Sequence, residues 1–345
     1  MHILFDHSNP FLLAHGGLQT QIEQTRNALL QTGVRVDYLE WWNPNQKADL
    51  IHFFGRPHPS YIHQAHQKGI PVVFSELLTG TGSRSGSVLF IQALLIRIFR
   101  HALPRDFAAR MAWTSYSLAD AVIALTDWEK QLMTNLFSTP IENLHVVPNG
   151  VEPIFFETPV PSPTRKPHLI CTATITERKR VLELAQSALF AGVPVRFVGK
   201  PYSPEDAYYR RFTQVVNESG GLLEFCGDIP DRTQLAAEYR TAAGFALLSA
   251  MESQSLSALE AAACGCPLLL SALPWAYSSF GSHASYVPLA SPAKTAPLLR
   301  QFFDSLPRTV QPPPIFSWDS VAQRLIAIYS DAIAARSRTP DRHGP

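Results

Sequence analysis

Three adjacent cationic residues, Arg178, Lys179 and Arg180, occur where a helix is expected to begin after a strand. The amino-terminal end of a helix carries a partial positive charge, so cations are normally disfavoured there. A bound diphosphate would balance the three charges, because the free N–H groups of a helix start also bind phosphate. The alternative is that these side chains point into water or pair with Glu177 and Glu183. The triplet therefore indicates either a diphosphate site or a solvated helix start.

Two glutamates, Glu252 and Glu260, follow the strand expected at 244–249. Glu252 should lie on the loop at the carboxyl end of that strand, where open parallel sheets bind ligands. Glu260 falls early in the next helix, where it either serves a site or closes a capping box that begins at Ser257. The residues that could offer backbone N–H groups to a phosphate between the two glutamates are Ser253, Gln254 and Ser255.

Two glycines, Gly16 and Gly17, come between the first expected strand and the first expected helix. Glycines at such a place let a ligand approach the backbone, and the exposed N–H groups favour phosphate. An ordinary turn has the same signature, so the pair indicates either a phosphate loop or a simple connection.

Strands and helices alternate along most of the chain and would position these residues. Short segments rich in Val and Ile, such as 34–39, 49–54 and 71–76, alternate with stretches whose apolar residues have helical spacing. A second alternation begins at His168. Repeated alternation of this kind predicts a mostly parallel sheet covered by helices on both faces, one in each half of the chain. The expected fold class is therefore α/β.

A proline-rich segment separates the two halves. Residues 158–167 read TPVPSPTRKP, and four prolines in ten residues can continue neither a helix nor a central strand. We interpret this segment as a linker between domains. The predicted division is an N-terminal domain at 1–157, a C-terminal domain at 168–318, a C-terminal helix at 319–335 and a disordered tail at 336–345.

The composition excludes several classes of protein. The 345 residues correspond to about two domains, and 46% hydrophobic with 17% charged residues rules out a disordered chain. A formal net charge of +1 provides no overall basic field for nucleic-acid binding. The four cysteines form no C-x-x-C pair and the histidines no recognisable ligand set, so no metal is expected. No signal peptide or membrane span is visible, which predicts a cytoplasmic protein.

Positive charge is nevertheless concentrated in one stretch. Residues 84–110 contain five arginines and one acidic residue, Asp106, a net charge of +4 beside the apolar run Val88–Phe99. This combination is typical of an amphipathic segment at the surface of an anionic membrane. A core helix with a solvated basic edge is the alternative.

Several segments together resemble glycosyltransferase family 4. The stretch ESQSLSALEAAACGCP from Glu252 is similar to the E-x7-E signature of that family, and VVPNGVE from Val146 is similar to the end of its first domain. The other similar segments are GGLQTQIEQTRNALLQTG at 16–33, ADAVIALTDWEK at 119–130 and FSWDSVAQRLIAIY at 316–329. They occur in the order of the family and cover residues 1 to about 330.

The resemblance implies the GT-B fold, two Rossmann-like domains whose parallel sheets face a central cleft, with the C-terminal helix packing back towards the N-terminal domain. It also implies a retaining, hexosyltransferase-like enzyme of cell-envelope or polysaccharide biosynthesis. Such an enzyme moves a sugar from a nucleotide diphosphate-sugar to a hydroxyl group of a glycan, a lipid-linked acceptor or a small molecule. No metal or other cofactor is implied. A lipid-linked acceptor would fit contact of residues 84–110 with the inner face of an anionic membrane.

The resemblance assigns roles residue by residue. Glu252 and Lys179 match the catalytic positions, where Glu252 would bind the donor sugar and Lys179 the diphosphate. Glu260 matches the residue that binds the ribose hydroxyls. Gly16 and Gly17 match the glycine loop near the phosphates and the acceptor. The remaining donor-binding residues implied are Arg178, Arg180, Ser253, Gln254, Ser255 and Leu256.

Two positions depart from the family pattern. The arginine usually found five positions before the lysine is Thr174 here, and Arg178 or Arg180 would have to compensate. The histidine that many members carry after the strand at 71–76 is replaced by Glu76 or Leu77. These departures leave two other functions open, a GT-B-type sugar-nucleotide epimerase and a non-catalytic module that binds a nucleotide-sugar or a partner protein.

Overall fold

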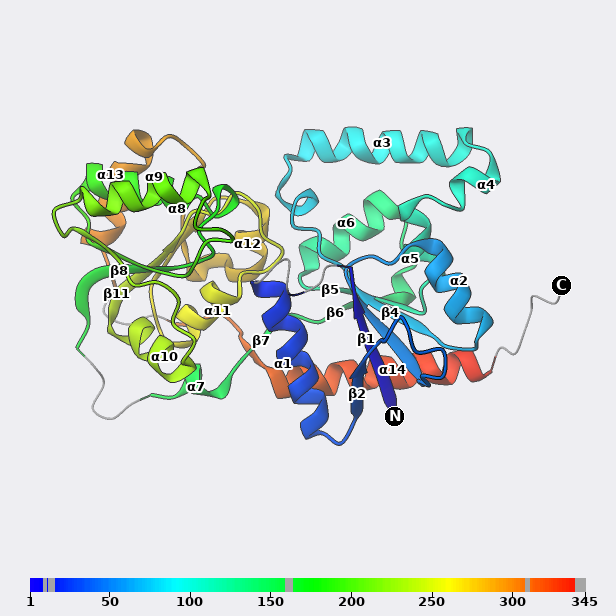
Figure 1. Ribbon diagram of the computed structural model, residues 1–345. Coiled ribbons are helices and arrows are strands. Elements are labelled where there is room, and N and C mark those ends of the chain that lie inside the picture. Colours follow the sequence, from blue (N-terminus) through cyan, green and yellow to red (C-terminus); the bar gives the residue numbers. More distant parts are fainter. Residues whose placement is uncertain (9–10, 12–15, 159–163, 308–310, 339–345) are drawn as a thin grey trace. The chain divides into compact units, whose positions relative to one another are not determined.

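The computed structural model describes residues 1–8, 11, 16–158, 164–307 and 311–338, which form two units (Figure 1). The first unit comprises Met1–Asn149 and the segment that begins at Trp318, and the second comprises Gly150–Ser317. The division therefore lies at Asn149, before the predicted linker at 158–167. Val151 and Phe155 explain this position, because both are fully buried in the core of the second unit.

The predicted linker and tail fall partly outside the described residues. Within the linker, residues 159–163 are not described, and Lys166 and Pro167 already belong to a strand. Of the tail, residues 339–345 are not described, while Arg336 and Ser337 complete the last helix.

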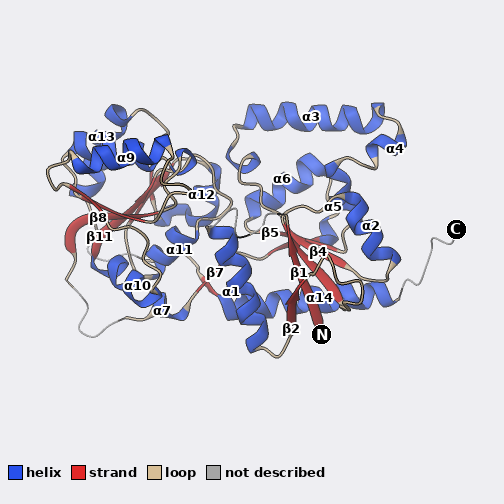
Figure 2. Cartoon of the chain, in the orientation of Figure 1, coloured by secondary structure: helices blue, strands red, loops and turns tan. Residues whose placement is uncertain are grey.

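The first unit contains a sheet of six parallel strands in the order β2-β1-β3-β4-β5-β6. The strands are β1 (His2–His7), β2 (Arg35–Tyr38), β3 (Leu50–Phe54), β4 (Val72–Ser75), β5 (Ala121–Ala124) and β6 (Leu144–Val146). Every residue of β3, β4 and β5 is buried, which is why these segments are largely apolar and show no alternation, with His52 and Ser75 as the polar exceptions. Helices cover the sheet, as Figure 2 shows by colour.

The described residues of the first unit form seven α-helices: α1 (Gly17–Gln31), α2 (Pro59–Gln67), α3 (Gly86–Ala102), α4 (Arg105–Ala108), α5 (Ser115–Leu118), α6 (Asp127–Phe137) and α14 (Trp318–Ser337). Three short 3-10 turns accompany them: η1 (Thr81–Ser83), η2 (Ala112–Thr114) and η3 (Ile141–Asn143). The expected helix at 319–335 corresponds to α14, which packs against α1 of the same unit. No helix among the described residues is long and apolar enough to span a membrane.

The second unit repeats the architecture with the strand order β10-β9-β8-β11-β12-β13, again all parallel. Its strands are β8 (Lys166–Thr172), β9 (Val195–Val198), β10 (Leu223–Phe225), β11 (Ala242–Leu247), β12 (Leu268–Ser271) and β13 (Ser285–Val287). A separate pair, β7 (Gly150–Val151) and β14 (Phe316–Ser317), joins the two ends of the unit. The helices are α7 (Pro153–Phe156), α8 (Val181–Ala191), α9 (Ala207–Asn217), α10 (Arg232–Thr241), α11 (Leu256–Ala263), α12 (Pro274–Phe280) and α13 (Pro292–Asp304).

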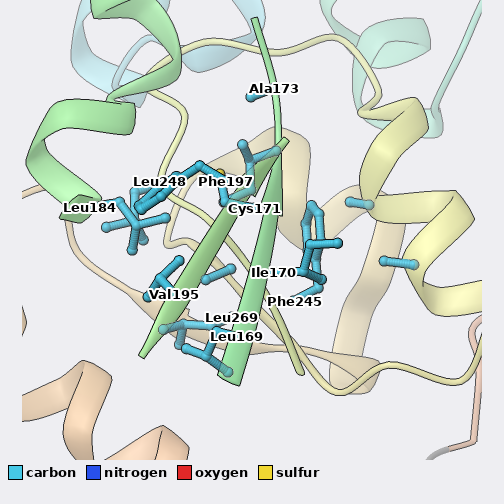
Figure 3. Packing of buried hydrophobic residues seen from close by; sticks show 14 of the residues in the cluster. Leu169, Ile170, Cys171, Ala173, Leu184, Val195, Phe197, Phe245, Leu248 and Leu269 are labelled. Carbon is cyan, nitrogen blue, oxygen red and sulfur yellow. The ribbon is translucent and has the colours of Figure 1, made fainter. Parts of the chain in front are cut away.

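The core of the second unit lies on both faces of its sheet. Figure 3 shows buried side chains on both sides of the central strand β8 and its neighbours, with Phe197 on one side and Ile170 and Phe245 on the other. Two strand ends approach closely at Gly199, where a Cβ atom would lie 2.0 Å from the carbonyl oxygen of Ala173. Only glycine fits this contact. The close approach of Gly199 to Ala173 brings the carboxyl ends of β8 and β9 together. The loop after β8 then leads to Arg178 and Lys179.

A buried polar contact fixes α14 within the first unit. The imidazole of His52 on β3 is fully buried and hydrogen-bonds Tyr329 of α14 through Nδ1 at 2.6 Å and Ser75 of β4 through Nε2 at 2.7 Å. Burial lowers the pKa of His52 from 6.5 to about 3. The ring is therefore neutral at physiological pH, and one N–H and one lone pair satisfy its two partners.

The neutral His52 predicts that acid destabilises the fold. As the pH falls below about 6.5 the unfolded chain binds a proton at His52 while the folded chain does not, so the free energy of unfolding decreases by about 1.4 kcal/mol per pH unit from this group. Urea unfolding at about pH 7 and about pH 5 should therefore show a pH-dependent loss that is about 2 kcal/mol smaller in His52→Gln. The exposed His63 provides a control, since His63→Gln should keep the wild-type pH dependence. Equal pH dependence in wild type and His52→Gln would contradict the assignment.

Candidate active site

The strand order of the second sheet places two loops next to each other at its carboxyl edge. β8 lies between β9 and β11, and the chain leaves β8 towards β9 but later returns on the other side to form β11. Such a reversal of strand order is where open parallel sheets bind ligands. The loop after β8 leads to Arg178 and Lys179, and the loop after β11 carries Glu252.

Arg178, Lys179 and Glu252 are in contact and are called the Glu252 cluster. The Lys179 ammonium donates a hydrogen bond to Oε1 of Glu252. Arg178 Nη1 lies 3.3 Å from Oε2 of Glu252 and 2.7 Å from the carbonyl oxygen of Met251. The backbones are joined as well, because the N–H of Ala250 donates to the carbonyl of Arg178 at 2.8 Å. Two loops more than 70 residues apart in sequence are thus held together at one point.

The electrostatics of the cluster keep Glu252 ionised. Burial alone would raise the pKa of Glu252, but the charges of Lys179 and Arg178 and the hydrogen bond from Lys179 outweigh it and lower the pKa. A lysine ammonium has three N–H donors and an arginine guanidinium has five, so one carboxylate does not saturate the two cations. The cluster can therefore hold a polyanion such as a diphosphate while the glutamate accepts hydrogen bonds from hydroxyl groups.

Arg180 is directed to a different partner. Glu177–Lys179 form a 3-10 turn, Arg180 adopts the left-handed conformation with φ of 51°, and α8 begins at Val181. Arg180 donates a hydrogen bond of 2.7 Å to the carbonyl oxygen of Ala290. The expectation that the three cations open the helix is therefore wrong, because the chain turns before α8 begins. Of the two arginines considered as replacements at the Thr174 position, Arg178 is the one that contacts Glu252 together with Lys179.

The helix that carries Glu260 begins earlier than a capping box at Ser257 requires. Ser255 is the N-cap residue of α11, and its Oγ accepts a hydrogen bond of 3.4 Å from the N–H of Ala258. Leu256 is therefore the first residue of the helix, and Glu260 lies in its second turn. The capping-box interpretation of Glu260 is wrong, because its carboxylate has other partners. Ser253 and Gln254 lie on the loop between Glu252 and the cap, as expected.

Glu260 belongs to a second set of charged residues, called the Glu260 cluster, with Glu152, Arg232 and Tyr239. Arg232 Nη2 lies 2.5 Å from Oε1 of Glu260 and 2.6 Å from Oε2 of Glu152, and Nε donates to the same Glu152 oxygen at 2.7 Å. Tyr239 donates to Oε2 of Glu260 at 3.3 Å. The guanidinium also lies over the ring of Phe155, 4.7 Å from its centroid. The cluster joins α7, α10 and α11, which contact one another (Figure 1).

Burial dominates the electrostatics of this second cluster. It raises the pKa of Glu260, with the nearby charge of Glu152 adding to the effect, although the charge of Arg232 opposes it. For Arg232, burial is outweighed by the two carboxylates, which raise the pKa of its guanidinium. The guanidinium of Arg232 is thus shared by two carboxylates.

Sequence reasoning missed Glu152 and Arg232 as site residues. Glu152 ends the VVPNGVE segment but received no role of its own. Arg232 is the first residue of α10, a position where the helix dipole disfavours a cation. The same signal that singled out residues 178–180 was therefore present at Arg232.

Three positions considered in the sequence belong to the first unit: Gly16, Gly17 and Glu76, the last of which stands where the family pattern has a histidine. Gly16 has φ of 137° and is the N-cap of α1, whose first residue is Gly17, so both stand at a helix start as expected. Glu76 directly follows β4 and is buried, and it accepts a hydrogen bond from Tyr116 with Arg56 at 3.8 Å. A carboxylate paired with an arginine thus occupies the place where a histidine was considered.

Within the described part of the chain, no three His, Cys, Asp or Glu side chains gather in a way that could hold a metal ion.

Comparison with known proteins gives relatives that are named as glycosyltransferases. Residues 35–150 match a protein family described as "Glycosyl transferase 4-like domain". A D-inositol 3-phosphate glycosyltransferase from Xylanimonas cellulosilytica is 29% identical over 178 residues, 45% of this chain and 41% of that protein. An MMP alpha-(1->4)-mannosyltransferase from Mycolicibacterium hassiacum is 29% identical over 218 residues, 57% of this chain and 51% of that protein. The chain thus matches about half the length of these curated relatives or less.

Solved structures resemble the chain over nearly its whole length. A sucrose-phosphate synthase from Thermosynechococcus elongatus superposes with a TM-score of 0.70 at 17% identity, covering 97% of this chain and 100% of that one. Anabaena Alr3699/HepE, solved in complex with UDP, superposes with a TM-score of 0.61 at 16% identity, covering 98% of each. At such identities the similarity establishes the fold, two Rossmann-like units of the GT-B type. Residues 35–150 are thus similar to a glycosyltransferase 4-like domain, and the fold of the whole chain is similar to that of these GT-B proteins.

Proposed function

We propose that this protein is a retaining glycosyltransferase that moves a sugar from a nucleoside diphosphate-sugar to a hydroxyl group of its acceptor. The observation that carries the proposal is the Glu252 cluster at the strand reversal of the second sheet. It combines two cations suited to a diphosphate with an ionised, buried carboxylate suited to sugar hydroxyls. The similarity to glycosyltransferases supports the same reaction class.

The cations of the cluster would stabilise the leaving group. As the bond between the anomeric carbon and the diphosphate breaks, negative charge grows on the departing phosphate oxygen. Lys179 and Arg178 are positioned in advance by Glu252 and Met251, so little reorganisation is needed when that charge appears. The first N–H groups of α11 add partial positive charge to the same loop.

The Glu260 cluster would bind the nucleoside part of the donor. Its carboxylate is buried, and each oxygen accepts one hydrogen bond, Oε1 from Arg232 and Oε2 from Tyr239, so each oxygen keeps a further lone pair in a fixed direction. Two ribose hydroxyls are the natural partners of a carboxylate fixed in this way. Because Anabaena Alr3699/HepE was solved with UDP, uridine diphosphate is the first nucleotide to test.

The proposal also covers the stereochemistry of the transfer and the residues that would contact the acceptor. In the retaining reaction the acceptor hydroxyl attacks from the face that the diphosphate leaves, and the anomeric configuration of the product reports it directly. The glycine loop at Gly16 and the paired Glu76 of the first unit are the candidates for acceptor contacts. A cytoplasmic location and a role in cell-envelope or polysaccharide synthesis remain predictions from the sequence.

Calorimetry with a panel of nucleoside diphosphates, followed by a donor-hydrolysis assay, tests the proposal. We expect one nucleoside diphosphate to bind, the corresponding sugar nucleotide to be hydrolysed slowly without acceptor, and both results to persist with a chelator present. Epimerised donor without acceptor would instead identify the epimerase, and binding without turnover the non-catalytic module. Absence of binding by every nucleotide would exclude the transferase, the epimerase and a module that binds a nucleotide-sugar, and would leave a module that binds a partner protein.

A further inference from the structure

The helix α3 of the first unit exposes almost all of its large apolar side chains. Only Leu89 is buried, although Ala93 and Ile96 also pack against the core of the unit. Figure 1 shows α3 in cyan on the outer side of α6, which separates it from the sheet. Seven side chains of α3 are between 46% and 70% exposed: Val88, Phe90, Ile91, Leu94, Leu95, Ile98 and Phe99. We call these seven residues the apolar face of α3.

The spacing of these residues makes the apolar face continuous. With 3.6 residues per turn, the seven side chains spread over roughly half of the helix circumference, opposite the side that carries Leu89 and Ile96. The buried side is fixed in place, since Arg100 donates a hydrogen bond to the carbonyl oxygen of Phe137, the last residue of α6. The apolar face therefore cannot turn inward, and folding of the unit leaves it uncovered by the described residues.

Basic side chains border the apolar face. Arg97 and His101 lie at one margin of the helix and are exposed, as are Arg84 before the helix and Arg110 after it. Asp106 is the only acidic residue of the segment 84–110. A broad apolar face with a basic margin fits the boundary between acyl chains and anionic headgroups. A second copy of the chain fits it less well, because pairing two such faces would bring the arginine-rich margins together.

We propose that the apolar face of α3 inserts into the surface of an anionic phospholipid membrane and docks the protein there. The apolar side chains enter the acyl region while Arg84, Arg97 and Arg110 meet lipid phosphates. The helix lies along the surface and does not cross the membrane. This surface is separate from the charged clusters of the second unit, and the proposal holds whether or not the chain transfers a sugar.

Vesicle flotation of the full chain tests this proposal. The probes are vesicles of phosphatidylcholine alone and of phosphatidylcholine with an equal amount of phosphatidylglycerol. We expect the chain to float with the anionic vesicles. The double variant Phe90→Glu with Ile98→Glu should weaken this binding by about a hundredfold, because each change removes a large apolar side chain from the membrane. Unchanged binding by this variant would overturn the proposal.

A charge variant and a matched control separate the two parts of the interaction. Arg97→Glu with Arg110→Glu should weaken binding to anionic vesicles by at least about fivefold per position, with no effect on neutral vesicles. Phe190 of α8 is also strongly exposed but lies in the second unit, so Phe190→Glu should bind vesicles as the wild type does. Circular dichroism confirms that each variant is folded.

Light scattering of the same samples decides between the membrane and a second copy. The membrane proposal expects a monomer in solution that binds anionic vesicles. A dimer that dissociates in the Phe90→Glu, Ile98→Glu variant, together with no flotation of the wild type, would assign the face to self-association and overturn the proposal.

Discussion

Replacement of Lys179 by alanine is expected to lower kcat/KM for sugar transfer by a factor of about 10² to 10³. Lys179 lies at the carboxyl edge of the second sheet and contacts the buried carboxylate of Glu252. Its positive charge would meet the leaving diphosphate in the transition state, where the negative charge is greatest. Most of the loss should therefore appear in kcat, with a smaller rise of the donor KM.

The experiment needs controls because Lys179 also neutralises Glu252. Without the lysine, Glu252 keeps the charge of Arg178 and the hydrogen bond from Ser249, and its pKa should rise towards the value that burial favours. Urea unfolding of Lys179→Ala separates lost stability from lost catalysis. Lys294→Ala removes an exposed lysine of α13 and should leave kcat/KM unchanged. A Lys179→Ala protein that is folded and fully active would refute the diphosphate assignment.

The neighbouring arginines provide an internal comparison. Arg178 contacts Glu252, whereas Arg180 donates to the carbonyl of Ala290. Sequence reasoning treated them as equivalent because both flank the lysine. The left-handed backbone at Arg180 directs its side chain to a different partner from that of Arg178, and no local pattern predicts a non-glycine residue in that conformation.

The alternation of strands and helices, in contrast, was predictable, because apolar runs bounded by glycine and proline specify short buried strands.

Other parts of the fold were beyond local reasoning. The helix α13 begins with Pro292 but contains Pro297, a residue that normally indicates a break within a helix. The division at Asn149 depends on Phe155, which packs into the core of the second unit. This is a long-range contact, and the local proline pattern of 158–167 pointed to a later division. Loop 252–255 lies beside Lys179 because both follow neighbouring parallel strands, and this strand order comes from the structure and was not predicted.

The Glu260 cluster was the least predictable feature of the site. Arg232 is 28 residues from Glu260 and 80 residues from Glu152, and three different helices bring them together. Nothing local relates these positions, and the capping-box pattern around Glu260 pointed to a different role. Only the packing of α7, α10 and α11 shows that a single guanidinium serves two carboxylates.

Arg232→Met is accordingly expected to lower the free energy of unfolding by about 3 kcal/mol at neutral pH. The change removes the partner of two carboxylates, and one of them, Glu260, is buried. The Arg232 side chain is itself 33% exposed, so we expect the lower end of the range for a broken buried pair. Arg211→Met is the matched control, because Arg211 is 62% exposed and its partner Glu177 is 3.9 Å away. It should change the stability by no more than about 0.5 kcal/mol.

The pH dependence distinguishes lost charge from lost packing over Phe155. Without Arg232 the folded-state pKa of Glu260 rises further above its unfolded value, so the folded chain binds more protons than the unfolded chain. Proton binding by Glu260 therefore stabilises the folded state fully at pH values below the pKa of Glu260 in the unfolded chain. This stabilisation is lost as the pH rises through the pKa of Glu260 in the folded chain. The deficit of Arg232→Met should therefore be smaller at about pH 5 than at about pH 7. Lost packing alone would give the same deficit at both.

Removing the isolated charge should restore part of the stability. In the double variant Arg232→Met with Glu260→Gln the amide needs no cation, so it should be more stable at neutral pH than Arg232→Met alone. Nucleotide binding should not recover in parallel, because the amide presents an N–H group where the proposal requires a second acceptor for the ribose hydroxyls. Calorimetry and urea unfolding of the same proteins thus separate the structural role of Glu260 from its role in binding. If both properties recover together, Glu260 is a structural residue and the ribose assignment is wrong.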